Sequence, residues 1–310
     1  MIERVTFSEE IKKQALALGF DACGICPARN SGEEARYMEW IRESCQGGMT
    51  YLERNIEKRI DPRLLVDGAR SIISVALNYY PSVKLPGKVP QFAYYAYGKD
   101  YHEVMREKLC ALFDWIKERF PEVSGRCFSD SAPVLERFWA AQAGIGFVGK
   151  NTLLIIPGKG SYFFLGELII NLELDYDSPI SENCGDCRRC LNSCPTGAIE
   201  KPYWVNARNC ISYQTIENKG EISPDIVPNL RNNVFGCDIC QKVCPWNRGA
   251  QPHITPEFMP SEAFMSLDLE TLAGMDEADF RVIFRRSAVK RTKFAGLKRN
   301  VAAISETRRK

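Results

Sequence analysis

The sequence has no long hydrophobic run, and it contains only two histidines among its 310 residues. No stretch reaches the roughly eighteen apolar residues that a membrane-spanning helix requires. The opening residues, MIERVTFSEE, contain neither the apolar core of a secretory leader nor a pair of arginines. We therefore expect a cytoplasmic protein that does not enter a membrane.

A large excess of charge of one sign is also absent, since 41 lysines and arginines nearly balance 39 acids and the net charge is only +2. The distribution is nevertheless uneven, because the segment from Arg285 to Lys310 contains ten lysines or arginines and a single acid, Glu306. A basic tail on a mildly acidic body can contact the phosphates of a nucleic acid, or it can be a solvated helix face. The composition leaves both interpretations open.

The length allows one large domain or two ordinary ones, and the 45% apolar content is that of a folded globular chain. We expect an α+β fold with a mixed sheet in a first domain, residues 1–175. Residues 176–250, rich in cysteine and proline, form a second module, and residues 251–310 carry the basic tail. The patterns predict helices over 6–19 and 100–120, strands over 21–28 and 69–80, and a hairpin over 152–174.

The segment CGDCRRCLNSCP at residues 184–195 is the strongest signal. Thirteen cysteines in a chain of this length, without a leader, indicate metal ligation or redox chemistry. The spacing CxxCxxCxxxCP is typical of ferredoxins, in which the fourth cysteine serves a second [4Fe-4S] cluster. We predict two such clusters in a ferredoxin-like module. The first takes Cys184, Cys187, Cys190 and Cys244, and the second takes Cys194, Cys210, Cys237 and Cys240.

Zinc is the main alternative ligand, because CxxC pairs also build structural zinc sites with four cysteines. A zinc site, however, has no use for a third cysteine at the same spacing or for a fourth that is followed by proline. The pattern therefore favours iron and sulfide.

Two other motifs fail on their context. Cys23 and Cys26 form a CxxC before a proline, but they lie in an expected strand, where their side chains point to opposite faces. We interpret both as buried thiols.

Gly144, Gly146 and Gly149 have the GxGxxG spacing, but an expected helix precedes them and a strand follows, the reverse of a dinucleotide-binding turn. Nicotinamide binding is therefore excluded.

Asp130, in the segment FSDSAPVLERFWAA, allows two interpretations. It can cap the following helix, since aspartate or serine before Ala-Pro is good capping chemistry. It can also donate a proton if burial raises its pKa. The residues alone favour the cap. His102 in GKDYHEV is likewise expected to be a residue of the first turn of a helix rather than a ligand.

Several segments together resemble one family, the cobalamin-dependent, iron–sulfur epoxyqueuosine reductases. The likeness extends from about residue 10 to about residue 301 and is to the form without a C-terminal helical-repeat extension. The segments that carry it are EKRIDPRLL (57–65), YGKDYHEVMREKL (97–109), SDSAPVLER with AGIGFVGKNTLLI, CGDCRRCLNSCPTGAI, NCISYQTIENKG (209–220), FGCDICQKVCPWN (235–247) and the tail SAVKRTKFAGLKRN.

The resemblance implies an oxidoreductase that converts epoxyqueuosine to queuosine at the wobble position of tRNA, the last step of queuosine synthesis. It implies that residues 1–175 bind cobalamin and that the two clusters reduce this cofactor. The sequence lacks the DxHxxG motif by which many cobalamin-binding proteins are recognised. It also favours Asp130 as a proton donor over Asp130 as a cap. The positions that match those around the cofactor are Arg59, Asp130, Leu154, Leu165, Ser212 and Lys219.

One expected partner is tRNA, whose anticodon region enters the active site and whose backbone contacts the basic tail of the protein. The other is an external low-potential electron donor. We expect a monomer.

Two rival functions remain open. One is a two-cluster electron carrier whose first domain only docks a partner. The other is a corrin-dependent reductive dehalogenase, although those enzymes usually begin with a twin-arginine leader that MIERVTFSEE lacks.

Overall fold

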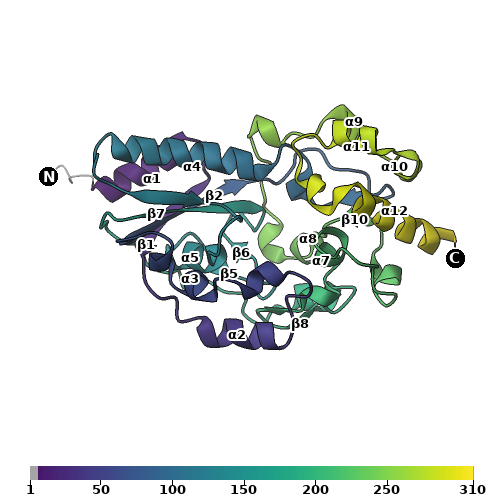
Figure 1. Cartoon of the computed structure of the whole chain (residues 1–310), viewed down its shortest axis with the longest axis horizontal. Coiled ribbons are helices and arrows are strands. Elements are labelled where there is room, and N and C mark those ends of the chain that lie inside the picture. Colours follow the sequence, from purple (N-terminus) through teal and green to yellow (C-terminus); the bar gives the residue numbers. More distant parts are fainter. Residues whose placement is uncertain (1–5, 310) are drawn as a thin grey trace.

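A four-stranded sheet forms the centre of the first half of the chain (Figure 1). The computed structural model describes residues 6–309. β2 and β7 lie in the middle and are buried along almost their whole length, which explains their runs of branched and aromatic residues. The strand order is β1 (Ala22–Pro27), β2 (Ser71–Asn78), β7 (Phe163–Ile170) and β4 (Gly125–Phe128).

The expected α+β architecture is confirmed, but the expected mixed sheet is wrong, because every pairing in this sheet is antiparallel. The segment that connects β1 to β2 leaves and re-enters the sheet at the same end of the two strands, where the Ala28 N–H donates to the Arg70 carbonyl at 2.8 Å. The chain therefore turns back beside β1. A parallel pair would require a connection that crosses the sheet.

The expected hairpin over 152–174 is also wrong. β7 pairs with β2 and β4, whereas β6 (Leu154–Ile155) pairs with β5 (Phe147–Val148). An isolated bridge between Ile156 and Gly160 closes the turn between the two segments. An apolar run shows that a strand is buried but does not show which strands it pairs with, so the pattern could not separate these arrangements.

Helices cover both faces of the sheet (Figure 1). α1 (Phe7–Ala17) and α4 (Tyr101–Lys117) pack on one face, and α5 (Glu136–Gln142) packs on the other. Cys23 joins the hydrophobic cluster under α1 and α4, while Cys26 joins the cluster under α5. The two thiols therefore lie on opposite faces, as expected, but only Cys26 is fully buried, whereas Cys23 is partly buried. Burial raises the pKa of each thiol to about 12.

The cysteine-rich part and the C-terminal helices form the other half of the molecule, in green and yellow in Figure 1. A short parallel pair, β3 (Gln91–Phe92) with β10 (Asn233–Phe235), joins this half to the first. The other elements are α2 (Glu34–Arg42), α3 (Ile56–Ile60), α6 (Arg189–Ser193), β8 (Ile199–Lys201), β9 (Trp204–Val205), α7 (Ile211–Ile216), α8 (Ile239–Lys242), α9 (Glu262–Met265), α10 (Leu269–Gly274), α11 (Glu277–Ile283) and α12 (Lys293–Arg309).

One hydrophobic cluster runs through this second half and draws residues from all three predicted segments. Phe92 packs near Phe235 and Phe284, with ring centroids 6.4 Å and 5.8 Å away. The domain boundaries near residues 175 and 250 stay predictions, since this shared core crosses them. Within residues 6–309, no helix combines the length and the apolar content that a membrane crossing requires.

Candidate functional site

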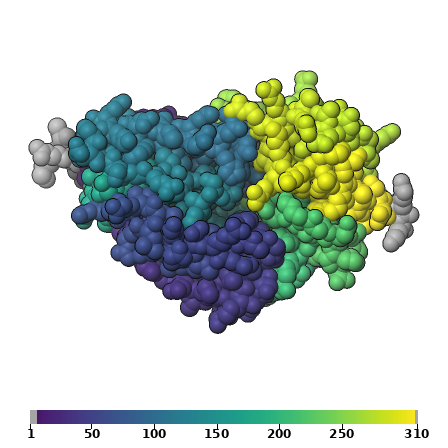
Figure 2. Space-filling view, viewed as in Figure 1, coloured from purple at the N-terminus to yellow at the C-terminus, as the bar shows by residue number. Residues whose placement is uncertain are grey.

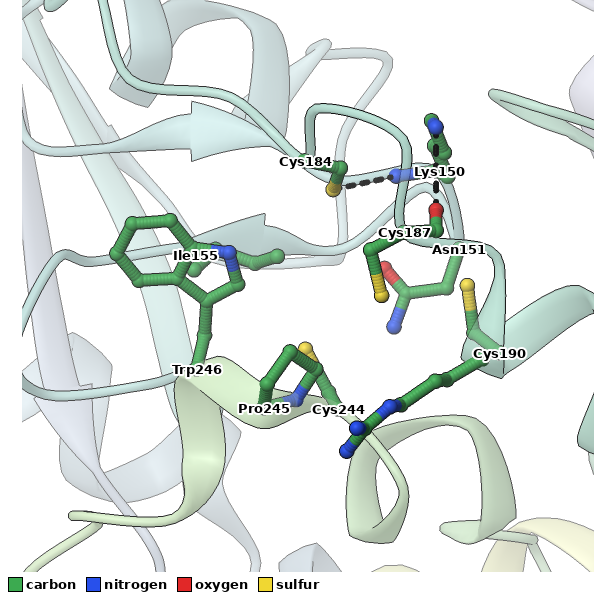
Figure 3. A pocket seen from close by; sticks show the side chains of 10 residues that line it. Lys150, Asn151, Ile155, Cys184, Cys187, Cys190, Cys244, Pro245 and Trp246 are labelled. Carbon is green, nitrogen blue, oxygen red and sulfur yellow. Dashed lines mark hydrogen bonds between the residues drawn. The ribbon is translucent and has the colours of Figure 1, made fainter.

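Four cysteines line one small pocket in the cysteine-rich part (Figure 3). Cys190 lies on α6, and two more of the cysteines lie in the turn before this helix. The fourth, Cys244, lies just after the end of α8. They are the set predicted for the first cluster, including the distant member of the second motif. The pocket contains Cys184, Cys187, Cys190 and Cys244.

Lys150 braces this pocket, and it was not predicted from the sequence. Its N–H donates to the Cys184 sulfur at 3.5 Å, and its ammonium donates to the carbonyls of Cys187, at 3.1 Å, and Gly185 (Figure 3). Hydrogen bonds to sulfur tune the potential of an iron–sulfur cluster.

The segment that resembled a dinucleotide-binding turn has the context that excluded it. α5 ends before the first glycine, β5 directly follows Gly146, and β6 begins after Gly149. Gly144 has a φ of +71° and directly follows Ala143, the C-cap of α5. A Cβ at Gly146 would lie 2.3 Å from the Ile155 carbonyl, so this glycine permits a close approach of the chain to itself.

The second set of cysteines, Cys194, Cys210, Cys237 and Cys240, also gathers in one place. Burial raises the pKa of Cys237 to about 12, and the neighbouring thiols of Cys210 and Cys194 act in the same direction. Burial likewise raises the pKa of Cys240, which is affected by Cys237, by Cys210 and by Cys190 of the first set. The two sets are therefore close enough to interact with each other.

In the part of the chain that the structure describes, no three or more Cys, His, Asp or Glu side chains could together hold a metal ion. A [4Fe-4S] cluster differs from a lone ion, since each of its four iron atoms takes one thiolate. Ligation of two such clusters by the two sets stays a prediction.

Asp130 lies where the loop after β4 meets the start of α4. The Tyr101 hydroxyl donates a hydrogen bond to the Asp130 carboxylate. The Nε2 atom of His102 lies 3.7 Å from the same carboxylate, and its Nδ1 atom lies 2.7 Å from Asp100. The interpretation of Asp130 as a helix cap is wrong, because α5 begins six residues later, at Glu136, with Leu135 in the capping position.

The charges around Asp130 favour a proton on the histidine. Hydrogen bonding to Asp100 and Asp130 raises the pKa of His102 to about 9. Burial acts to raise the pKa of Asp130, but its interactions with His102 and Tyr101 outweigh burial and lower that pKa. The raised pKa that a proton donor was expected to have is therefore absent in this state, and the proton resides on His102.

Figure 2 shows a central hollow where the purple and teal parts of the chain meet the yellow C-terminal part. The Asp130 side chain is 64% exposed. Burial raises the pKa of Tyr51, and the charges of Glu217 and Asp130 add to this effect. Arg291 lies 5.8 Å from the Tyr51 ring and pairs with Glu217 at 2.7 Å. These four side chains therefore border one region.

Of the polar residues expected around a cofactor, Arg59 and Lys219 have distinctive local environments, and their role stays a prediction. Arg59 is 9% exposed, and its Nε atom has no hydrogen-bond partner. Ser212 lies on α7, and Lys219 follows the end of this helix. Burial lowers the pKa of Lys219, and the nearby cations Arg291, Lys293 and Arg299 lower it further. An unpaired buried donor and a group of cations fit the amides and the phosphate of cobalamin.

The two leucines expected to contact the cofactor lie deeper. Leu154 and Leu165 are buried and pack in a cluster with Ala76 and Ala140. The Leu165 carbonyl accepts a hydrogen bond from the Ser129 hydroxyl at 2.9 Å. Their contact with a corrin stays a prediction.

The basic tail is folded, and several of its cations hold other parts of the chain. Arg291 pairs with Glu217, Arg286 pairs with Glu103, and Arg299 donates to the carbonyls of Gln214, Asn218 and Gly220. Arg285, Lys290 and Lys293 are exposed at the start of this region. The side chains of the last three residues lie outside the described part.

Comparison with known proteins gives two matching families. Residues 59–131 match "Epoxyqueuosine reductase QueG, DUF1730", and residues 183–247 match "4Fe-4S double cluster binding domain". An epoxyqueuosine reductase from Leadbetterella byssophila is 48% identical over 304 residues, which cover 97% of this chain and 99% of the relative.

Solved structures agree with these matches. An epoxyqueuosine reductase in complex with an epoxyqueuosine-modified tRNA-Tyr stem loop has a TM-score of 0.89 at 33% identity, covering 96% of this chain and 80% of that chain. The enzyme from Bacillus subtilis, with its catalytic aspartate loop swung out of the active site, has a TM-score of 0.87 at 33% identity and the same coverage. The resemblance seen in the sequence is confirmed, and the chain belongs to the epoxyqueuosine reductase family.

Proposed function

We propose that this protein reduces epoxyqueuosine to queuosine at the wobble position of tRNA, the last step of queuosine biosynthesis. What supports this best is that the chain combines, in the fold of a relative that binds an epoxyqueuosine-modified stem loop, two sets of four cysteines and a carboxylate beside a protonated imidazole. A tRNA substrate implies action in the cytoplasm.

The overall reaction sets what the site must supply. Removal of the epoxide oxygen as water consumes two electrons and two protons and leaves a carbon–carbon double bond. Iron–sulfur clusters transfer single electrons, so the two electrons arrive one after the other from an external low-potential donor. The closeness of the two cysteine sets, through Cys190 and Cys240, favours transfer from one cluster to the other.

Cobalamin is the proposed cofactor of the central hollow. When bound, it supplies a cobalt centre of low potential that can act as a nucleophile or a reductant. Arg59, Ser212 and Lys219 would bind its polar groups, and the carboxylate of Asp130 would face it. Leu154 and Leu165 would support the apolar side of the corrin from the core.

Protons reach the substrate oxygen through Asp130. Its carboxylate is exposed and can pass a proton to the oxygen as the ring opens. His102, whose pKa is about 9, holds a proton at neutral pH 3.7 Å away and can reprotonate Asp130. The corresponding loop can leave the site in the Bacillus subtilis relative, so the position of this carboxylate matters for turnover.

The tRNA backbone is expected to contact the exposed cations at the start of the tail. Arg285, Lys290 and Lys293 are available for phosphates, because they are not the residues that hold other segments of the chain. Contacts of this kind make affinity depend strongly on salt. We propose that the protein acts as a monomer.

The test is conversion of the nucleoside itself. The protein, with both clusters reconstituted and cobalamin added, is incubated without oxygen with epoxyqueuosine-containing tRNA and a low-potential reductant, and the nucleosides are analysed by mass spectrometry. Formation of queuosine supports the proposal. No conversion by protein that retains its iron and sulfide would instead favour a two-cluster electron carrier.

A further inference from the structure

We propose that Glu136 is a positioning residue that holds the Asp130 loop in the active site. The proposal rests on the proposed function, because it assumes that Asp130 delivers the proton. Glu136 is the first residue of α5, and its carboxylate accepts a hydrogen bond from the Asp130 backbone N–H. This bond joins the backbone of the acid to a helix packed on the sheet.

The loop itself has an unfavourable conformation at the acid. Asp130 has a φ of +54°, in the left-handed region that residues with a Cβ rarely adopt. The adjacent bonds fix its neighbours: the Ser129 hydroxyl donates to the Leu165 carbonyl at 2.9 Å, and the Ser131 N–H donates to the Ser129 carbonyl at 2.7 Å. Strained backbone persists only where surrounding contacts hold it, and Glu136 supplies the contact at Asp130.

α5 gives Glu136 a rigid base. Trp139 and Ala140, in the middle of this helix, are fully buried against the sheet. A Cβ at Gly24 of β1 would lie 2.0 Å from the Ala143 carbonyl, which shows how closely the end of the helix approaches the strand. The helix therefore cannot shift easily, and a hydrogen bond from its first residue fixes the loop relative to the sheet.

Five charged or titratable groups interact with the Glu136 carboxyl, and one of them is Tyr101 on α4, whose pKa Glu136 helps to raise. The other four are Asp130 on the loop, Arg137 on α5, His102 on α4 and Glu167 on β7. Glu167 is fully buried, and neither carboxyl oxygen has a hydrogen-bond partner, so burial raises its pKa well above the usual value and keeps it neutral. Burial and the charge of Asp130 also raise the pKa of Glu136, to about 8. As a neutral acid, Glu136 can accept the N–H without repelling the Asp130 carboxylate.

Hydrogen exchange and kinetics on three variants test this role. Glu136→Ala removes the acceptor, Glu136→Gln keeps an uncharged acceptor of the same length, and Gln142→Ala is a control at the other end of α5. In Glu136→Ala, we expect faster amide exchange in residues 129–135 and a fall in kcat of up to about 100-fold, without a matching rise in KM for tRNA. Glu136→Gln should restore slow exchange and most of the turnover.

The outcomes separate this proposal from the function on which it rests. If Asp130→Asn turns over like the wild type, the acid role fails. If Asp130→Asn is inactive while Glu136→Ala keeps wild-type exchange and kcat, only the positioning role fails. Should Glu136→Ala not fold, Glu136→Asp, whose carboxylate is one methylene shorter, serves instead. Wild-type exchange of residues 129–135 in that variant would overturn the proposal.

Discussion

His102 approaches Asp130 with one ring nitrogen, Nε2, at 3.7 Å, while its other nitrogen lies 2.7 Å from Asp100. A histidine between two carboxylates is stabilised in its protonated form, which is why its pKa rises to about 9. Because Asp130 is itself ionised in this state, the proton of the His102–Asp130 pair lies on the imidazole. His102 can pass this proton to Asp130 when the substrate oxygen accepts one.

The first prediction concerns the pH dependence of stability. The pKa of His102 is raised in the folded state, so its stabilising contribution is complete below its ordinary value of 6.5 and is lost as pH rises through about 9. The difference in Tm between the wild type and His102→Gln should therefore be largest near pH 6 and shrink toward pH 9.5. Thermal unfolding across this range measures it. A difference that does not change with pH would contradict the shift.

The second prediction concerns the acid. Asp130→Asn should lower turnover by roughly 10²- to 10⁴-fold, because an amide cannot pass on the proton. Iron, sulfide and bound corrin should stay at wild-type levels. Asp114→Asn, an exposed acid on α4, is the matched control and should behave like the wild type. Nucleoside analysis after a fixed incubation compares the three proteins, and normal turnover by Asp130→Asn would remove it as the acid.

The third prediction concerns the crossed cluster ligands. Cys184→Ser combined with Cys244→Ser removes two ligands from one cluster, so about four of the eight iron atoms should remain. Cys184→Ser combined with Cys194→Ser removes one ligand from each, so both clusters should be damaged.

Iron and sulfide analysis of the two double variants distinguishes the arrangements. If each cluster used four cysteines in chain order, the results would be reversed, with the second pair of substitutions sparing one cluster. Such a reversal would also contradict the pocket that places Cys244 with the first three cysteines.

The fourth prediction concerns tRNA binding. Replacing Lys290 and Lys293 by Gln should weaken tRNA binding and reduce its salt dependence, because each phosphate that the protein no longer neutralises lowers the logarithmic slope by roughly 0.7 to 0.9. Lys13 and Lys117, exposed on α1 and α4, give a control with the same change in charge. Filter binding at several salt concentrations measures both proteins. Equal slopes would exclude the start of the tail from the interface.

The gathering of the first four cysteines in one pocket was predictable because ligand spacing is a local property. Cys184, Cys187 and Cys190 lie within one short segment, and the ferredoxin pattern already pairs them with a distant cysteine. The strands and main helices were also predictable, since burial leaves a periodic pattern. The pairing of β7 with β2 and β4 was not, because it depends on contacts between segments far apart in the chain.

The environment of Asp130 was less predictable for the same reason. A short aspartate before Ala-Pro has the local signature of a cap, and only the fold shows that α5 begins at Glu136 and that Tyr101 and His102 meet the carboxylate. Lys150 was missed because no rule based on spacing connects a lysine to cysteines more than thirty residues away.

The most direct test of the account is the conversion of epoxyqueuosine in tRNA by wild-type protein and by Asp130→Asn, each with and without added cobalamin, under reducing and oxygen-free conditions. The account predicts queuosine only in the sample that combines wild-type protein with cobalamin. Equal conversion by the wild type in the absence of cobalamin, with no corrin detectable in the protein, would contradict the central claim.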